Sequence, residues 1–432
     1  KILKEAPLIE IDSIVAITFT RKAAVEMKER IRLEIYREIK KEHDRDLKLK
    51  WKKLRDLITT ANIDTIHGFC TSIIRDNFAS AGIDPAFTLI EETDSAVKLQ
   101  EFAEEAIEEY LENTDHDGTV NHVLDKYGTA TFVSGKLRDD IIRLYFSIRG
   151  HGAFEKEMEK WKDSSCNELA SMAISLLINL HEKYKDFKNK KNVLDFNDLE
   201  IMTEKLLENH GIKERYFQRF RYFLVDEFQD VNPIQERILS GLTEKDGTIP
   251  PGRLFIVGDH KQSIYGFRGA NYKIFDRVCE KINKNGTVKY LSNCYRSTAN
   301  IVDTVNMIFE KLIEPFEKLQ LPFSDNGKEL KVQLITWKKD ELSRKSKWDT
   351  IKKLLADDKH KEILKRELQL TGEDEGNSHN KKDYQGAIVA GLVQKLTGEY
   401  RDEKGGFTCK DIAILLRSRT NLKSIEHALR AR

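Results

Sequence analysis

The sequence predicts an α/β fold, a doubly wound parallel sheet with a large helical insertion and a partial second α/β domain. Three observations lead to this prediction. Continuous apolar runs at residues 13–19, 222–225 and 254–257 are typical of parallel strands that are buried on both faces. Residues 86–194 carry almost no strand signal, but much of this stretch has a helical period of about 3.6 residues. The length of 432 residues exceeds what one hydrophobic core usually organises, so we expect two or three domains.

Composition excludes several classes of protein. The 73 Lys and Arg residues nearly balance the 72 Asp and Glu residues, and the net charge of +1 gives no global field that would mark a nucleic-acid or membrane binder. Any such binding must come from a local patch. A hydrophobic content of 40% argues against disorder, and only 7 Pro and 23 Gly favour helices over a turn-rich all-β fold.

Cysteine usage and hydropathy indicate the compartment. The five cysteines are odd in number and never spaced as CxxC, so neither a disulfide framework nor a zinc or iron–sulfur site is indicated. There is no apolar stretch of about 18 residues, and the first residues lack the apolar core of a signal peptide. We therefore expect a soluble cytoplasmic protein that does not contact a membrane.

A helix should follow the first predicted strand at once. Apolar residues recur at helical spacing from Ala24 to Ile35, and Thr20 is placed to cap the first turn. The basic run at 37–55 mixes nine Lys and Arg residues with acids, which favours a solvated helix surface over a binding patch.

The helical insertion contains one strongly acidic segment. Residues 91–115 carry ten acidic side chains against Lys98 alone. We interpret the segment as an amphipathic helix with a solvated acidic face. The apolar residues with helical spacing are Leu99, Phe102, Ala103, Ala106, Ile107, Tyr110 and Leu111.

A second α/β pattern begins after about residue 290. Strands are predicted near 288–291, 331–337 and 412–416, and the polar stretch 371–383 is a predicted loop. The expected domains are a first α/β domain from 1–85 and 195–290, the helical insertion from 86–194, and the partial second domain from 291–432.

Two adjacent carboxylates follow a predicted buried strand. The run Phe223-Leu-Val-Asp226-Glu227-Phe-Gln-Asp230 places them at the carboxyl edge of the sheet, where α/β proteins bind ligands. A divalent metal beside phosphates needs one such carboxylate, and a water that attacks a phosphate needs a neighbouring base. An Asp-Glu pair by itself is usually a surface pair, but the strand before this one favours a site. Next, Asn232-Pro233-Ile-Gln235 predicts a capped helix start.

A second loop follows the strand at 254–257. It runs from Gly258 to Ala270 and carries Gln262, Tyr265 and Phe267 in a glycine-flanked segment. Exposed aromatic side chains beside a cation are suited to stacking on single-stranded bases. The alternative is that both rings only pack the loop against the core.

Taken together, five segments resemble UvrD/Rep-type superfamily 1 DNA helicases, and the AddA/RecB branch most closely. The family fold is RecA-like, that of the P-loop NTPases. The segments occur in the family's order over residues 14 to about 300, so chance agreement is not a serious competitor. They are Thr18-Phe-Thr-Arg-Lys-Ala-Ala24, Thr65-Ile-His-Gly-Phe-Cys70, Asp226-Glu-Phe-Gln-Asp230, Gly258-Asp-His-Lys-Gln-Ser-Ile-Tyr-Gly-Phe-Arg-Gly-Ala270 and Asn293-Cys-Tyr-Arg-Ser297.

The resemblance implies roles in ATP hydrolysis for five residues. Asp226 would coordinate Mg²⁺, and Glu227 would be the base for the attacking water. Gln262 would sense the γ-phosphate and link it to DNA. Tyr295 would stack on adenine, and Arg296 would be the arginine finger that reaches across from the second motor domain.

The resemblance also implies a DNA path. Phe19, His67, Tyr265 and Phe267 would line it. The run Asp195-Phe-Asn-Asp198 resembles a further family element, but its interpretation as a plain helix cap fits the residues equally well.

The sequence departs from the family pattern at the phosphate loop. No Gly-rich loop ending in Gly-Lys-Ser/Thr is present, and residues 247–254 mimic only its glycine spacing. In the family this loop would fall before Lys1, and the late motifs of the second motor domain would follow Arg432. We therefore expect a chain truncated at both ends and inactive alone, with any nuclease domain beyond Arg432.

The function implied by the resemblance is the core of an ATP-dependent DNA helicase or translocase with 3′→5′ polarity. It would belong to a UvrD-like or AddA/RecB-like helicase–nuclease in DNA repair and recombination. Its partners would be single-stranded DNA, junctions of single- and double-stranded DNA, and a second helicase–nuclease subunit. The alternative is a non-catalytic, helicase-like DNA-binding scaffold. Intact Asp226, Glu227, Gln262 and Arg296 argue against the scaffold, whereas the missing phosphate loop favours it unless the chain is truncated.

Overall fold

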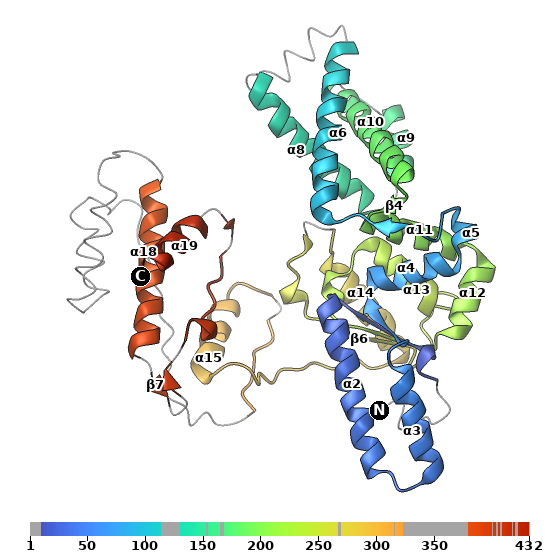
Figure 1. The fold of residues 1–432 in the computed structure, drawn as a ribbon, viewed down its shortest axis with the longest axis vertical. Coiled ribbons are helices and arrows are strands. Elements are labelled where there is room, and N and C mark those ends of the chain that lie inside the picture. Colours follow the sequence, from blue (N-terminus) through green and yellow to red (C-terminus); the bar gives the residue numbers. More distant parts are fainter. Residues whose placement is uncertain are drawn as a thin grey trace. The chain divides into compact units, whose positions relative to one another are not determined.

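The computed structural model describes residues 10–113, 130–152, 154–164, 168–266, 269–314, 316–322, 379–399, 401–402, 405–406, 408–416, 418–419 and 422–431. The chain divides into two compact units, Lys1–Tyr290 and Leu291–Arg432. Figure 1 shows the elements of both units along the chain.

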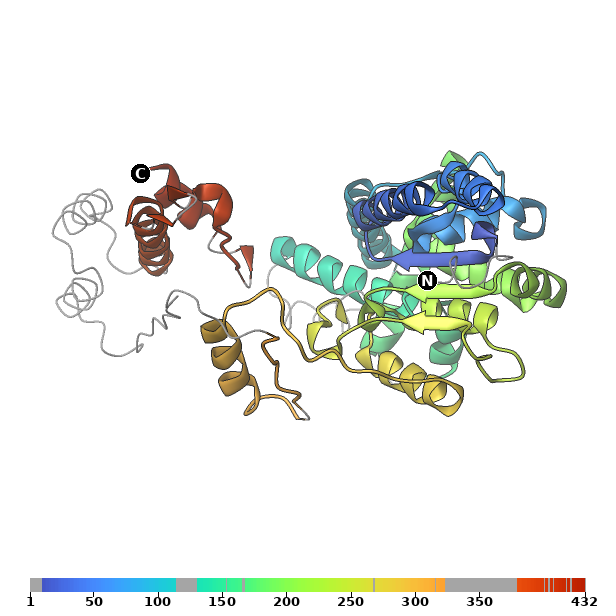
Figure 2. The same ribbon diagram turned by 90° about the horizontal axis from the view of Figure 1, so that it is seen from below.

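The first unit is built on a four-stranded parallel sheet with the order β2-β1-β5-β6. Its strands lie side by side in Figure 2. The strands predicted at 13–19, 222–225 and 254–257 are confirmed within one residue at each end, whereas β2 has a polar sequence and was not predicted. The strands are β1 (Ile14–Thr18), β2 (Asn62–Thr65), β5 (Tyr222–Val225) and β6 (Leu254–Ile256).

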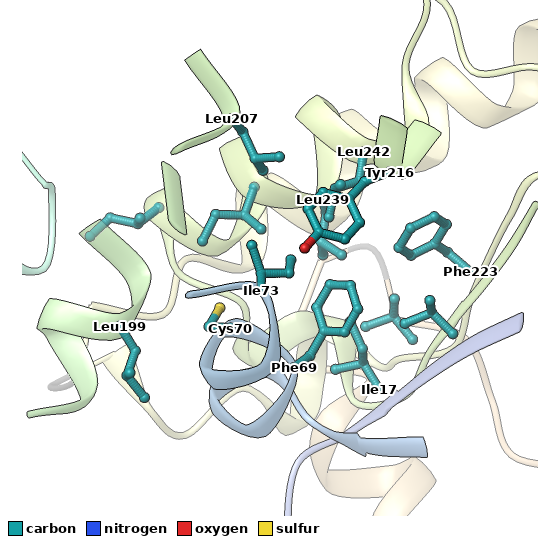
Figure 3. Packing of buried hydrophobic residues seen from close by; sticks show 14 of the residues in the cluster. Ile17, Phe69, Cys70, Ile73, Leu199, Leu207, Tyr216, Phe223, Leu239 and Leu242 are labelled. Atoms are coloured by element: carbon teal, nitrogen blue, oxygen red, sulfur yellow. The ribbon is translucent and has the colours of Figure 1, made fainter. Parts of the chain in front are cut away.

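Alternation along the strands sends side chains to both faces of this sheet. On one face, Val15 and Phe223 join the largest core, which the helices after β2 and on either side of β5 complete. Figure 3 shows Phe69, Tyr216 and Phe223 packed together there. The other face carries a smaller core, to which β1 contributes Ala16. Helices therefore pack on both faces of the sheet, as the predicted doubly wound fold requires.

The helix predicted after the first strand is confirmed. α2 (Arg21–Lys41) begins at Thr20, whose Oγ1 accepts a hydrogen bond of 3.1 Å from the N–H of Ala23. α2 packs against α3 (Arg45–Leu57), and the two helices cover the β1–β2 half of the smaller core. On the same face, Phe255 of the edge strand β6 is 59% exposed and lies beside Leu224. That half of the face is thus left uncovered in the part of the chain that the structure describes.

Residues between β3 and β4 form a helical body with its own apolar core. α6 confirms the predicted acidic amphipathic helix, since Leu99, Ala103, Ala106 and Ile107 are buried on one side. Figure 1 shows α6 beside α10. β3 pairs in parallel with β4, so the two ends of the insertion run side by side. The elements are β3 (Thr88–Leu89), α6 (Glu92–Asn113), α8 (Ala130–Arg149), α9 (Phe154–Ser164), α10 (Glu168–Lys191) and β4 (Val193–Leu194).

The remaining helices of the first unit surround the sheet. α13 starts as predicted, with Pro233 in its first turn and a capping box in which Asn232 and Gln235 hydrogen-bond each other's backbone N–H groups. The helices are α4 (Ile66–Asp76), α5 (Phe78–Ala81), α11 (Phe196–Glu208), α12 (His210–Arg219), α13 (Pro233–Thr243) and α14 (Tyr272–Asn285), with 3₁₀ turns η1 (Ile11–Ser13), η2 (Phe228–Asp230) and η3 (His260–Gln262).

The described residues of the second unit do not form the predicted α/β pattern. Its described elements are α15 (Ala299–Phe309), α18 (His379–Glu399), the antiparallel pair β7 (Arg401–Asp402) and β8 (Gly405–Gly406), η5 (Cys409–Asp411) and α19 (Leu422–Arg430). Parallel pairing among its described residues is limited to a single bridge between Asn293 and Gln320. No second parallel sheet is therefore present among the residues described.

The strand predictions at 288–291 and 412–416 are wrong, because both segments are irregular. A strand needs a paired neighbour, and side chains at these positions are uncovered: Leu291 is 89% exposed and Leu415 94%. The prediction at 331–337 lies outside the described residues. Residues 371–378 of the predicted loop also lie outside the described residues, and from His379 onward the loop prediction is wrong, because α18 begins there. None of the described helices combines the length and apolar character needed to cross a membrane.

Candidate functional site

Because the four strands are parallel, their carboxyl ends meet at one edge of the sheet. The predicted site residues follow these ends. Phe19 comes after β1, His67 after β2 and Asp226 after β5, while Asp259 begins the segment after β6 that leads to Tyr265. The fold thus brings together residues that are as far apart in sequence as Phe19 and Tyr265.

The acidic pair after β5 is open to solvent. The N–H of Asp226 donates to the carbonyl of Ile17 at 3.0 Å, which continues the ladder between β5 and β1. Asp226 Oδ1 then accepts the N–H of Glu227 at 3.0 Å. Glu227 has a φ of 51°, a left-handed conformation that is uncommon for a non-glycine residue and often occurs at functional sites. Both carboxylates are exposed at the end of the strand.

A buried amide connects this pair to the next loop. Gln229 is 1% exposed, and its Nε2 donates to Glu227 Oε2 at 2.7 Å. Its Oε1 accepts the N–H of Asp259 at 3.0 Å. A Cβ at Gly258 would lie 2.6 Å from the same Oε1, so a side chain at this position would displace the Gln229 amide from the N–H of Asp259. Gln229 was not predicted as a site residue. Its position in the polar run directly after a buried strand could have indicated one.

Gln262 belongs to the same hydrogen-bonded chain. Its Nε2 donates to Asp259 Oδ2 at 3.1 Å, and Lys261 Nζ lies 3.1 Å from Asp259 Oδ1. Burial by itself would raise the pKa of Asp259, but the hydrogen bonds from Gln262 and Lys261 hold it below its ordinary value. The ionised Asp259 therefore links Gln262 through Gln229 to Glu227.

The electrostatics of the acidic loop favour a cation. Burial, together with the negative charge of Glu227, raises the pKa of Asp230 above its ordinary value. Among the described residues, no group of three or more His, Cys, Asp or Glu side chains could hold a metal by itself. A single exposed carboxylate such as Asp226 fits Mg²⁺, which commonly takes one or two protein carboxylates and completes its shell with phosphate oxygens and water.

The structure pairs two of the predicted DNA-path residues. The rings of Phe19 and Tyr265 lie with their centroids 4.7 Å apart and their planes at 41°. Phe19 is 41% exposed and Tyr265 is half-buried, so the pair is at the surface and not in the core. Phe267 lies outside the described residues.

His67 contacts a buried residue, Glu200, that was not predicted from the sequence. Its Nε2 lies 3.0 Å from Oε1 of the buried Glu200, and its ring packs on Phe196 with the centroids 4.5 Å apart. The His67 side chain remains 30% exposed.

The run 195–198 is a helix cap, as one interpretation predicted, and also part of a buried ionic cluster. Asp195 and Asp198 form the capping box of α11. Arg149 at the end of α8 donates to Asp195 Oδ2 at 2.7 Å and to Asp198 Oδ1 at 2.6 Å, and Lys188 of α10 contacts both carboxylates. The cluster therefore joins the helical insertion to α11.

Tyr295 and Arg296 lie in the second unit. They are adjacent and exposed, with Tyr295 at 74%. The preceding Cys294 donates its N–H to the carbonyl of Gln320 at 2.7 Å, which fixes the backbone of this turn within its unit.

Known proteins with similar sequences are large helicase–nuclease subunits. The chain is 25% identical to the ATP-dependent helicase/nuclease subunit AddA of Acetivibrio thermocellus, with 72% of this chain and 36% of that protein aligned. It is 24% identical to the protein of the same name from Natranaerobius thermophilus, over 74% of this chain and 36% of the relative. The chain thus spans 36% of the length of these curated relatives.

The family model of the UvrD/REP helicase N-terminal domain matches residues 2–283. This range includes all four strands of the parallel sheet and every loop at its carboxyl edge described above. Because the match covers well over half of the chain, the protein belongs to the UvrD/REP helicase family.

Proposed function

We propose that this chain is the core of the motor of an ATP-dependent DNA helicase or translocase that moves 3′→5′ on single-stranded DNA. It would act in DNA repair and recombination as part of a helicase–nuclease. In this proposal residues 1–85 and 195–290 form the first motor domain, 86–194 an inserted helical domain, and 291–432 part of the second motor domain.

One observation carries the proposal. The acidic pair Asp226–Glu227, the Asp259–Gln262 segment and the aromatic pair Phe19–Tyr265 all lie at the carboxyl edge of one sheet. Groups suited to phosphate hydrolysis and groups suited to base stacking therefore share one edge. A motor that couples hydrolysis to movement on DNA needs such an arrangement.

The residues of the first unit would divide the hydrolytic work. Asp226 would hold Mg²⁺, which neutralises phosphate charge when bound. Glu227 would accept the proton of the attacking water, and the 2.7 Å hydrogen bond from Gln229 would fix the direction of its carboxylate. Gln262 would respond to the γ-phosphate and pass the response to Glu227 through Asp259 and Gln229.

The remaining site residues would bind DNA and complete the nucleotide site. Phe19 and Tyr265 would stack on bases, with His67 beside them, and Phe267 would extend the path. In the second motor domain, Tyr295 would stack on adenine, and Arg296 would stabilise charge during phosphoryl transfer.

The partners follow from the same proposal. Single-stranded DNA and its junctions with duplex would be the substrates. The relatives are named as one subunit of a helicase/nuclease, so we propose that a second helicase–nuclease subunit binds the full-length protein.

The test is DNA-stimulated ATP hydrolysis by the full-length protein that contains this chain. Glu227→Gln should lower kcat about 10²- to 10⁴-fold, because a general base contributes that much, while binding to single-stranded DNA is retained. Glu236→Gln is the matched control, since Glu236 lies one helical turn into α13, outside the acidic loop, and forms an ion pair with the exposed Arg277. Binding to DNA without any ATP turnover in the unaltered protein would refute the motor and leave a scaffold.

Two further measurements test the finer claims. Partial duplexes with a 3′ or a 5′ single-stranded tail report polarity, and unwinding should require the 3′ tail. The 432-residue polypeptide alone should show no DNA-stimulated ATPase, because its sequence has no Gly-Lys-Ser/Thr phosphate loop. Turnover by this polypeptide that disappears in Glu227→Gln would contradict that expectation.

A further inference from the structure

Glu200 is a buried carboxylate that lies within hydrogen-bond distance of three side chains from two other segments of the fold. It lies on α11 and is 1% exposed. His67 Nε2, near the start of α4, lies 3.0 Å from Oε1. Asn232 Nδ2 donates to Oε2 at 2.8 Å, and Gln235 Nε2 donates to Oε1 at 2.6 Å.

These partners lie at two different parts of the carboxyl edge. His67 follows β2, is one of the residues of the proposed DNA path and remains partly exposed. Asn232 is the N-cap of α13 and directly follows the acidic loop that begins at Asp226. One buried side chain thus touches both the proposed DNA contact and the helix that ends the proposed hydrolytic loop.

The chemistry of the cluster requires a carboxylate. An ionised carboxylate only accepts hydrogen bonds, and the amides of Asn232 and Gln235 both offer N–H groups to it. His67 Nε2 must then also donate, which fixes which ring nitrogen carries the proton facing α11. An amide at position 200 would turn one of its own N–H groups toward a donor, so at least one of the three links would break.

We propose that Glu200 is a positioning residue that couples the DNA path to the hydrolytic loop. This coupling role rests on the proposed function, because it assumes that His67 faces DNA and that the Asp226–Asp230 loop serves ATP hydrolysis. A shift of the His67 ring when DNA binds changes the hydrogen bond to Glu200. Because the same carboxylate holds the start of α13, that change reaches the residues after the acidic loop. The coupling therefore needs only the three hydrogen bonds of Glu200, to His67, Asn232 and Gln235.

A purely structural role makes a different prediction. If Glu200 served only to satisfy buried donors, its loss would lower the melting temperature but leave the ratio of DNA-stimulated to DNA-free ATPase unchanged. If it couples the two sites, the ratio itself falls. The ratio is therefore the decisive measurement.

The experiment uses the full-length protein with the variant Glu200→Gln, and oligo-dT as the probe. We expect the ratio of stimulated to DNA-free ATPase at saturating oligo-dT to fall at least about 5-fold, the lower end of typical coupling between sites. Glu204→Gln is the matched control, because Glu204 lies on the same helix and also bridges to α13, through Arg237, but does not contact His67. It should leave the ratio unchanged.

A double-variant cycle identifies the path. His67→Ala should also lower the ratio, and Glu200→Gln should add little further loss in the His67→Ala background, because both changes break the same connection. If Glu200→Gln proves unfolded at the assay temperature, Gln235→Met removes one of the two donors at the start of α13 while Glu200 and Asn232 stay in place. It should lower the ratio without changing oligo-dT affinity.

The outcomes separate this inference from the proposed function. A full-length protein with no DNA-stimulated ATPase refutes the proposed function itself. Two other outcomes overturn the coupling role alone, provided that the unaltered protein has DNA-stimulated ATPase. In the first, Glu200→Gln and Gln235→Met have the same ratio of stimulated to DNA-free ATPase as the control Glu204→Gln. In the second, the losses caused by His67→Ala and Glu200→Gln are fully additive.

Discussion

Replacement of Arg149 by Met should destabilise the junction between the helical insertion and α11. The loss of unfolding free energy should exceed that of a surface substitution. Arg149 is 2% exposed and donates three hydrogen bonds, two to Asp195 and one to Asp198. Lys188 contacts the same two carboxylates, so the cluster holds two cations and two anions. Without Arg149 the cluster would retain a buried net negative charge.

The magnitude follows from that imbalance. Removing one partner of a buried ion pair typically costs about 3–5 kcal/mol of unfolding free energy, because the other charge stays buried without compensation. Lys188 Nζ still lies 3.1 Å from Asp195 Oδ2, so we expect the lower end, about 3 kcal/mol. Arg149→Lys, which keeps the charge but not the planar fork, should fall between Met and the unaltered protein.

The assay is urea unfolding of the 432-residue polypeptide followed by circular dichroism. Arg138→Met is the matched control: Arg138 is on the same helix and also contacts two carboxylates, Glu104 and Asp139, but these are exposed. It should cost less than about 1 kcal/mol, as surface pairs do.

A pH series tests the cause. Burial alone would raise the pKa of Asp195, but the charges of Arg149 and Lys188 hold it well below its ordinary value. A carboxylate with a lowered folded pKa stabilises the protein above its ordinary pKa of about 3.9 and loses that contribution as the pH falls further. The difference in unfolding free energy between Arg149→Met and the unaltered protein should therefore shrink below about pH 4. The reasoning would be refuted if Arg149→Met cost no more unfolding free energy than the control Arg138→Met, or if its cost stayed constant down to about pH 2.

Three further predictions concern other parts of the molecule. Burial, followed by the charge of Arg149, lowers the pKa of His181 from 6.5 to about 4, so the folded state favours the neutral ring and stability falls as the pH drops through this window. Urea unfolding should show a loss of about 2 kcal/mol from about pH 7 to 5 that His181→Phe abolishes, and equal stability at both pH values in the unaltered protein would contradict it. In the full-length protein, Phe19→Ala and Tyr265→Ala should each weaken single-strand binding by about 1–3 kcal/mol for every sequence tested by fluorescence anisotropy, and a loss confined to one sequence would argue against stacking. In steady-state ATPase assays, Tyr295→Ala should chiefly raise KM for ATP and Arg296→Ala should lower kcat on the order of 10³-fold, so the reverse pattern would show that the two roles are wrongly assigned.

Local sequence signals predicted the elements that depend on neighbouring residues. The capped start of α2 at Thr20 and the capping box of α13 at Asn232 are set by side chains within three positions of each other. The buried side of α6 was likewise predicted from local sequence, because its apolar residues recur at helical spacing. β2 escaped prediction because Asn-Ile-Asp-Thr has no apolar run, and its strand conformation comes from pairing with β1.

Contacts between distant residues could not be predicted in this way. Glu200 and His67 are 133 positions apart, and Arg149 and Asp195 are 46 apart, so no spacing rule joins them. The segment at 412–416 is an error of the opposite kind, a strand predicted where none is present. Its five apolar residues favour a strand, but a strand forms only where a partner supplies hydrogen bonds. Periodicity reports which side of an element is apolar and does not report what covers it.

The uncovered half of one sheet face has a consequence for handling the polypeptide in solution. In the described sheet β6 is an edge strand; Phe255 is exposed on it, and Val257 is exposed directly after it. An exposed edge strand with apolar side chains is a template for strand pairing between molecules, which natural proteins usually block with charges, proline or a covering helix. The isolated polypeptide should therefore aggregate through β6 as its concentration rises, before any loss of its folded core.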